Sequence, residues 1–444
     1  MGAKRPEPDQ ERIARMLSLA EEIAPLPRMV NSPGLDQAFA ILAASYPGAV
    51  LHEYPSGSVA EDWIVPQAWA LRQGWLRDES GRVLASTEEC PLFVAPYSEP
   101  VDGWFTREEI APHLRTRPDR PQAFSLEHRN AYDFRLKDWG ITLPHARWQD
   151  LPEGQYHVHI EADFFDNTMK VGEWALPGEE GNTILLTAHI DELCNDDLSG
   201  CLVGLEIMRA LAKMPKRRNT YRLILAPEMF GTIFYAHNNP QVLAQAEGML
   251  NLEALGVGEG LCAKASLKGA ARVDAALCEA LDSLGLEYRA LGFFEGYGND
   301  ERVLEWPGVG IPSAALQRYP FAQYHTSDDV PTLLEGTLLE QAVQAGIRFA
   351  QILEADAVPR FSLNFQPWLT RRGLYLDRTT DLAAYHKLCN LVLFHVDGRH
   401  TLLDLARLSG LPFQAVQAYL DAFAEQGILH YEPVRPAPRS GGPS

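Results

Sequence analysis

Hydrophobic and polar positions follow two different periods along this chain. Residues 11–24 and 35–46 carry apolar side chains at helical spacing and predict two helices. Residues 61–160 alternate in short segments broken by Gly and Pro, which is typical of a β-rich module. From residue 181 to 355, short apolar runs alternate with helical patterns. This predicts a doubly wound, mostly parallel α/β sheet.

We therefore expect an α/β protein of five parts. Residues 1–60 form the helical start of the main domain, and residues 61–160 form an inserted β-rich module. The α/β core occupies residues 161–357. A helix-turn-helix pattern over residues 358–432 predicts a winged-helix domain, and residues 433–444 are a Pro/Gly/Ser-rich flexible tail.

Histidine and acidic residues follow the predicted core strands. His189 ends the run TILLTAH, and Asp196 lies just before the next helical pattern. Glu228 follows YRLILAP, Glu253 ends GMLNLE, and the segment YHTSDD (324–329) follows IPSAALQ. The carboxyl ends of parallel strands meet at one edge of a sheet, so we expect these residues to lie close together.

Imidazole and carboxylate side chains are ligands by which proteins hold zinc, so this edge is a predicted metal site. A nearby acid such as Asp191 would fix the tautomer of His189, and an unligated carboxylate could take a proton from water. Simpler roles stay open. Asp196 could cap the following helix, and Glu228 could be a solvated residue of a first helical turn.

The composition limits the partners. The chain has 444 residues, 46% of them hydrophobic, and a net charge of -20, which argues against nucleic acid or an anionic membrane as the main partner. No apolar run approaches the roughly 20 residues that span a bilayer. Six scattered cysteines without a C-x-x-C pair indicate neither a disulfide framework nor a zinc ribbon, so a cytoplasmic protein is expected.

The order HxD, NDxxSG, a strand-terminal Glu, NLE and YHTxxD resembles the family 28 zinc aminopeptidases over roughly residues 181–355. Through DWIVP, YSEPVDG, GNDER and RRGLY, the whole chain is similar to a bacterial subgroup with an inserted β module and a C-terminal winged helix. The resemblance implies zinc-dependent amide hydrolysis, chiefly aminopeptidase action. The added domains favour a small peptide or an aminoacylated metabolite as substrate.

Carried over by position, the resemblance implies that His189 and His325 are imidazole ligands and that Asp196 is the carboxylate shared between two metals. Because residue 229 is a methionine, we expect one firmly held zinc, bound by His189, Asp196 and His325. Glu253 is then either a fourth ligand to the first zinc or a ligand to a second ion.

The departure from the family pattern lies at residue 229. The family has two adjacent glutamates, the first a general base and the second a ligand, whereas this chain has Glu228 followed by Met229. A thioether is a poor zinc ligand beside oxygen and nitrogen donors, so a second ion would lack a ligand. If the alignment is shifted by one residue, Glu228 is the ligand and the base is missing. The family has a phenol before the second histidine that hydrogen-bonds the developing oxyanion, so the resemblance implies this role for Tyr324.

Charged residues near the last strands are candidates for substrate binding. Asp300 and Arg302 in GYGNDERV could bind charged end groups of the substrate. The free amine of a peptide needs a carboxylate, which Glu295, Asp300 or Glu253 could supply.

The winged-helix domain raises a rival class of function. Its expected recognition helix, residues 411–427, contains no Lys or Arg, whereas DNA binding normally needs several cations. We expect it to pack on the core, contact a partner or mediate homo-oligomer formation. Two alternative functions stay open: amide hydrolysis or acyl transfer in polysaccharide or natural-product biosynthesis, and a non-catalytic regulator acting through the winged helix.

Overall fold

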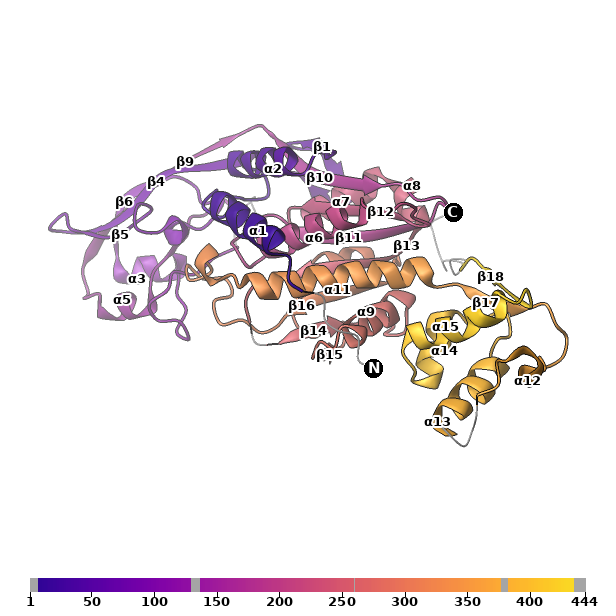
Figure 1. Cartoon of the computed structure of the whole chain (residues 1–444). Coiled ribbons are helices and arrows are strands. Elements are labelled where there is room, and N and C mark those ends of the chain that lie inside the picture. The colour runs from indigo at the N-terminus through magenta and orange to yellow at the C-terminus, as the bar shows by residue number, and fades with distance from the viewer. Residues whose placement is uncertain (1–6, 129–135, 259, 377–381, 435–444) are drawn as a thin grey trace.

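The computed structural model describes residues 7–128, 136–258, 260–376 and 382–434. At its centre is an eight-stranded sheet in the order β1-β10-β12-β11-β13-β16-β14-β15 (Figure 1). Its four central strands are parallel: β12 (Thr220–Ala226), β11 (Thr183–His189), β13 (Ala246–Glu253) and β16 (Ser313–Arg318). The outer strands are β1 (Val50–Pro55), β10 (Thr168–Leu176), β14 (Leu261–Lys264) and β15 (Arg289–Leu291). The predicted α/β class with a mostly parallel sheet is confirmed.

Helices cover both faces of this sheet. One face carries α1 (Gln10–Ile23), α2 (Pro33–Ser45), α6 (Leu198–Leu211), α9 (Arg272–Ser283) and α11 (Gly336–Ala355). The other carries α7 (Phe230–Asn238), α8 (Pro240–Gln245) and α10 (Asp300–Leu304). Side chains of β11 alternate between the two cores, with Ile184 and Leu186 in the first and Leu185 in the second. Burial on both faces explains why this strand has apolar side chains at three successive positions, 184–186.

A second, antiparallel sheet has its own core, around Phe93 and Val158. Its strands lie in the order β5 (Val83–Ser86), β4 (Ala68–Asp78), β9 (Gln155–Phe165) and β6 (Val101–Thr106). Strand β10 of the main sheet starts three residues after β9 ends, so the module is joined directly to the main sheet. Shorter elements nearby are β2 (Val59–Ala60), β3 (Trp63–Ile64), η1 (Pro91–Phe93), α3 (Arg107–Ile110), η2 (Ala111–His113), β7 (Leu114–Arg115), β8 (Ile141–Thr142) and α5 (His145–Asp150).

A winged-helix domain follows α11. It contains β17 (Val358–Phe361), α12 (Leu369–Arg372), α13 (Leu382–Ala384), the π-helix η4 (Tyr385–Val392), α14 (Leu402–Ser409), α15 (Phe413–Ala424) and β18 (Leu429–Glu432). The only remaining element of the described chain is η3 (Pro331–Leu333), before α11. From residue 435 onward, the expected tail lies outside the described residues. In the described part, no helix combines the length and apolar character that crossing a membrane requires.

The start of α15 packs on the core. The backbone N–H of Phe413 donates to Glu279 Oε1 on α9 at 2.8 Å. Leu402 and Leu405 of α14 join the same hydrophobic cluster as α9. DNA-reading helix-turn-helix domains contact bases with the start of this second helix, so the end used for such contacts is engaged with the core here.

Helix α6 begins in close contact with the end of β13. Asp197 caps the helix, and its Oδ1 accepts the backbone N–H of Gly200 and of Ala254, each at 2.9 Å. A Cβ on Gly200 would lie 2.4 Å from Asp197 Oδ2 and 2.5 Å from the carbonyl oxygen of Leu252. Only glycine fits here without moving backbone.

We expect Gly200→Ala to lower the free energy of unfolding by about 1–3 kcal/mol, because the new methyl group overlaps the end of β13. Urea denaturation measures this change. Gly154→Ala is the matched control, since no described atom lies within 4 Å of a Cβ at residue 154. Its stability should change by less than about 0.5 kcal/mol. Wild-type stability in Gly200→Ala would contradict the close approach.

Candidate metal centre

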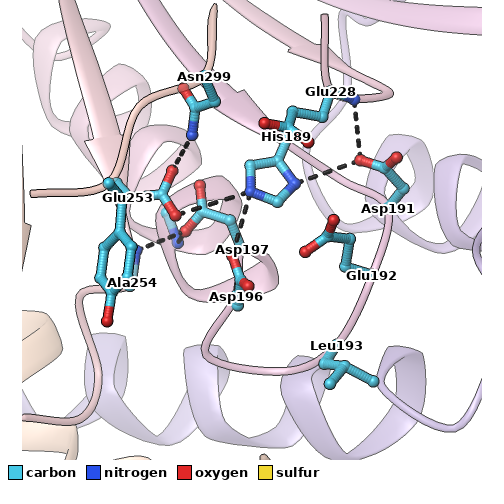
Figure 2. Close-up of polar contacts among 12 residues, drawn as sticks. His189, Asp191, Glu192, Leu193, Asp196, Asp197, Glu228, Glu253, Ala254 and Asn299 are labelled. Atoms are coloured by element: carbon cyan, nitrogen blue, oxygen red, sulfur yellow. Dashed lines mark hydrogen bonds and ion pairs between the residues drawn. The ribbon is translucent and has the colours of Figure 1, made fainter. Parts of the chain in front are cut away.

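Asp196 lies between two histidines that come from different blocks of the sequence. His189 Nε2 lies 3.2 Å from Asp196 Oδ1 and 3.7 Å from Glu253 Oε1 (Figure 2). On the other side, His325 Nε2 lies 3.0 Å from Asp196 Oδ2. Parallel pairing of β11 with β13 brings His189 and Glu253 to the same edge of the sheet. The four residues predicted as metal ligands therefore lie together, but the two histidines face different oxygens of Asp196.

Two further side chains, Glu192 and His128, adjoin His325. His325 Nε2 lies 3.2 Å from Glu192 Oε2, and Glu192 Oε1 lies 3.0 Å from His128 Nε2. Glu192 belongs to the loop after β11, whereas His128 belongs to the inserted module. Sequence reasoning missed both. Glu192 directly follows Asp191 and could have been considered together with His189 and Asp191. No motif spacing links residue 128 to these residues.

These side chains form two groups that fit a metal. His189, Asp196 and Glu253 offer ligand atoms within 4.8 Å of one another, and His128, Glu192 and His325 do the same. Around a tetrahedral zinc with bonds of about 2.1 Å, two ligand atoms lie roughly 3.4 Å apart. The separations given above, between 3.0 and 3.7 Å, bracket this value. Nitrogen and carboxylate oxygen are also the donors that zinc prefers.

Burial and charge act against each other at these groups. Burial opposes ionisation of Asp196, but His189 and His325 hold its pKa well below the usual range. Burial raises the pKa of Glu253 to about 7, against the effect of His189. Burial also disfavours the charged ring of His325, but Glu192 and Asp196 raise its pKa to about 10. The carboxylates therefore demand positive charge, which either imidazolium protons or a divalent cation can supply.

Asp191 contacts the ring of His189 in the first group. Its Oδ1 lies 3.2 Å from His189 Nδ1 and accepts the backbone N–H of Glu228 at 2.9 Å (Figure 2). A carboxylate on Nδ1 fixes the tautomer that leaves Nε2 with a lone pair for a metal. Asp191 thus has the geometry expected of an orienting residue.

Glu253 is oriented by a chain of side chains. Asn299 Nδ2 donates to Glu253 Oε2. Asn251 Nδ2 donates to Asn299 Oδ1, and Thr187 Oγ1 donates to Asn251 Oδ1, both at 2.8 Å. The segment GNDER therefore reaches the candidate centre through Asn299, which sequence reasoning did not single out.

The loop after β11 is fixed from two directions. Arg28 is fully buried, and its guanidinium donates to the carbonyl oxygens of Ile190 and Leu193. Asp329 Oδ2 accepts the backbone N–H of Asp196 at 3.1 Å. Arg28 lies far from the other blocks in sequence, so only the fold reveals its role.

Four non-glycine residues in or next to the two groups have strained backbone conformations. Glu192, Met229, Ala254 and His325 have φ values of 72°, 56°, 51° and 54°, in the left-handed region. Each such residue costs about 1–3 kcal/mol and persists only where its surroundings determine it. The strained positions include two residues of the groups and two that directly follow Glu228 and Glu253.

The residues predicted for catalysis also border the centre. Glu228 is half-buried and lies beside His189 (Figure 2). The Tyr324 ring stacks on the His325 ring, with centroids 3.8 Å apart. Burial and the neighbouring carboxylates, Asp196 foremost, raise the pKa of the Tyr324 phenol, so it keeps its proton and can donate a hydrogen bond.

The residues predicted for substrate binding separate in the structure. Asp300 is fully buried, and its Oδ1 accepts the backbone N–H of Met229 at 2.9 Å. Arg302 and Met229 line one cavity of about 510 Å³. Glu295 lies in an exposed turn, where its Oε2 accepts the backbone N–H of Gly292 at 2.6 Å. Asp300 and Arg302 therefore lie near the Glu228 loop, whereas Glu295 caps its own turn.

Comparison with known proteins assigns the chain to a family. A family model described as a domain of unknown function, DUF4910, matches residues 17–356. The chain belongs to the DUF4910 family. A winged helix-turn-helix model matches residues 360–431 of this DUF4910 protein. It is also 29% identical over 426 residues to a Clostridium acetobutylicum protein named for polysaccharide biosynthesis and an aminopeptidase-like domain, covering 93% of this chain and 95% of that one.

Solved structures share the fold of this DUF4910 protein. A C. acetobutylicum structure described as a peptidase matches with a TM-score of 0.81 and 27% identity, over 95% of this chain and 97% of that one. The zinc aminopeptidase BSAP of Bacillus subtilis matches with a TM-score of 0.55 and 17% identity, over 79% of this chain and 95% of that one. A peptidase M28 precursor of Shewanella amazonensis matches with a TM-score of 0.52 and 14% identity, over 81% of this chain and 98% of that one. The expected likeness to zinc aminopeptidases is confirmed at the level of the fold.

We expect Asp191→Asn to weaken zinc binding about 10–100-fold, because the carboxylate that orients His189 is lost. Competition with a fluorescent zinc chelator measures the affinity. Asp102→Asn is the matched control. Asp102 also pairs with a histidine, His157, at 2.6 Å, but it lies outside both groups. Wild-type zinc affinity in Asp191→Asn would contradict the orienting role.

Proposed function

We propose that this protein is a zinc-dependent hydrolase of an amide bond, acting as an aminopeptidase on a small peptide or an aminoacylated metabolite. The observation that carries the proposal is the convergence of His189, Asp196, Glu253 and His325 at one sheet edge, with Glu228 beside them. This edge is where α/β folds of this kind bind ligands. The aminopeptidase-like fold supports the same reaction class.

The proposed roles follow from the contacts. Zinc held by His189, Asp196 and Glu253 would polarise the amide carbonyl and lower the pKa of water. Glu228 takes the proton of the attacking water and passes it to the leaving amine. Tyr324 donates a hydrogen bond to the carbonyl oxygen as it gains negative charge.

Support for a small substrate is steric. Ser125 of the inserted module pairs with Thr326 of the segment that carries Tyr324 and His325. Chain segments from the core and from the module therefore meet at the proposed centre, which disfavours a folded protein as substrate. The cavity beside Met229 is lined by Trp63, Ile233 and Trp306, among others, so it offers an apolar surface next to the Glu228 loop.

A second candidate is amide cleavage on an N-acylated amino sugar or a related biosynthetic intermediate. The name of the C. acetobutylicum relative favours it, because that name refers to polysaccharide biosynthesis. Parallel assays on aminoacyl anilides, dipeptides and N-acetylated amino sugars separate the two. Release of an amino acid supports the aminopeptidase, and release of acetate alone supports the second candidate.

Glu228→Gln is expected to lower kcat by about 10²–10⁴-fold with unchanged zinc content, because the amide cannot accept the proton. Glu53→Gln, on the exposed part of β1, is the control and should keep wild-type kcat. If the Glu228 variant retains wild-type kcat, the general base is another group. Loss of zinc in this variant would instead identify Glu228 as a ligand.

Tyr324→Phe is expected to lower kcat by about 10²–10³-fold with little change in KM, because the hydrogen bond forms only in the transition state. Steady-state kinetics on a dipeptide measures both constants. An equal rise in KM with constant kcat would show that the phenol binds the ground state instead.

A further inference from the structure

We propose that the inserted module completes a second metal site, in which His128, Glu192 and His325 bind an ion that shares Asp196 with the first. This rests on the proposed function only in taking zinc as the metal. The inserted module is then part of the proposed centre.

The second site offers other ligands in place of the carboxylate that is missing at residue 229. Family 28 aminopeptidases, which this chain resembles, place a carboxylate ligand where this chain has Met229. Here Met229 lines the apolar cavity instead. Glu192 supplies a carboxylate from the loop after β11, and His128 adds an imidazole from the module.

The module is fixed to the segment that carries His325. Ser125 and Thr326 form an antiparallel bridge. The backbone N–H of Leu126 donates to the carbonyl oxygen of His325 at 2.9 Å, and that of Ser327 donates to the carbonyl oxygen of Phe124 at 2.9 Å. These bonds hold residue 128, two positions further along, next to His325.

Side chains strengthen this attachment. Arg117 Nη1 donates to the carbonyl oxygen of Tyr324 at 2.9 Å, and Arg120 forms an ion pair with Asp328. Both arginines belong to the module, and both partners flank His325. The module therefore contacts the His325 segment through backbone and side chains alike.

The geometry of Glu192 is that of a ligand between two imidazoles. Its two oxygens face His128 and His325 at 3.0 and 3.2 Å, and the residue is only 7% exposed. The two rings lie with centroids 4.9 Å apart. Among the described residues, Asp196 Oδ2 has no hydrogen-bond partner of favourable geometry, although His325 Nε2 is 3.0 Å away. A cation bound between His325 Nε2 and Asp196 Oδ2 would be a partner for both atoms.

Zinc stoichiometry tests the site. The purified full-length chain is dialysed against buffered zinc, and bound metal is measured by plasma mass spectrometry. Wild type should hold two zinc ions per chain, and His128→Ala and Glu192→Gln should each hold one. His157→Ala is the matched control: it removes a module histidine that pairs with exposed Asp102, and it should hold two.

One zinc in the wild type, or two in both His128→Ala and Glu192→Gln at wild-type affinity, would overturn the second site. Glu192 would then be held by protonated histidines alone. The failures are distinguishable. Two zinc ions falling to one in the variants, with no amide cleaved, would leave the site standing without the proposed function. A wild type that binds one zinc ion and cleaves peptides would support the proposed function and overturn the second site.

Discussion

A carboxylate as deeply buried as Asp196 has to be compensated by positive charge and hydrogen bonds, because an isolated buried charge costs several kcal/mol. His189 lies at one of its oxygens and His325 at the other. Its backbone N–H donates to Asp329, in the same segment as His325. The end of β11, the following loop and residues 324–329 are therefore held in one arrangement around a single charge. A divalent metal at the proposed centre would supply positive charge at the same place, and folding and metal binding would then be coupled there.

The two added parts relate to this centre in different ways. The inserted module and the winged helix lie at opposite ends of the molecule (Figure 1). The module reaches the centre through Leu126 and His128, whereas the winged helix packs on α9 through α14 and the start of α15. In the proposed second metal site, the module contributes a ligand through His128.

Much of this arrangement could be predicted because it depends on short-range patterns. The apolar run TILLTAH predicts β11, and parallel pairing then brings His189 to Glu253. The contributions of Glu192 and His128 could not be predicted in this way. Glu192 reaches His325 from a left-handed backbone, and His128 arrives through the docking of the module. Asp300 shows the same limit, since its carboxylate is buried on the Met229 backbone, a contact that sequence spacing does not reveal.

Anomalous diffraction from crystals of the zinc-reconstituted full chain, measured above and below the zinc absorption edge, shows directly whether metal ions bind at Asp196. We expect two peaks about 3.5–4 Å apart, one on each side of the Asp196 carboxylate. One peak should adjoin His189 and Glu253, and the other should adjoin His128, Glu192 and His325. Absence of a peak at both positions, with the two histidines still paired to Asp196, would contradict the assignment of this cluster as a metal centre.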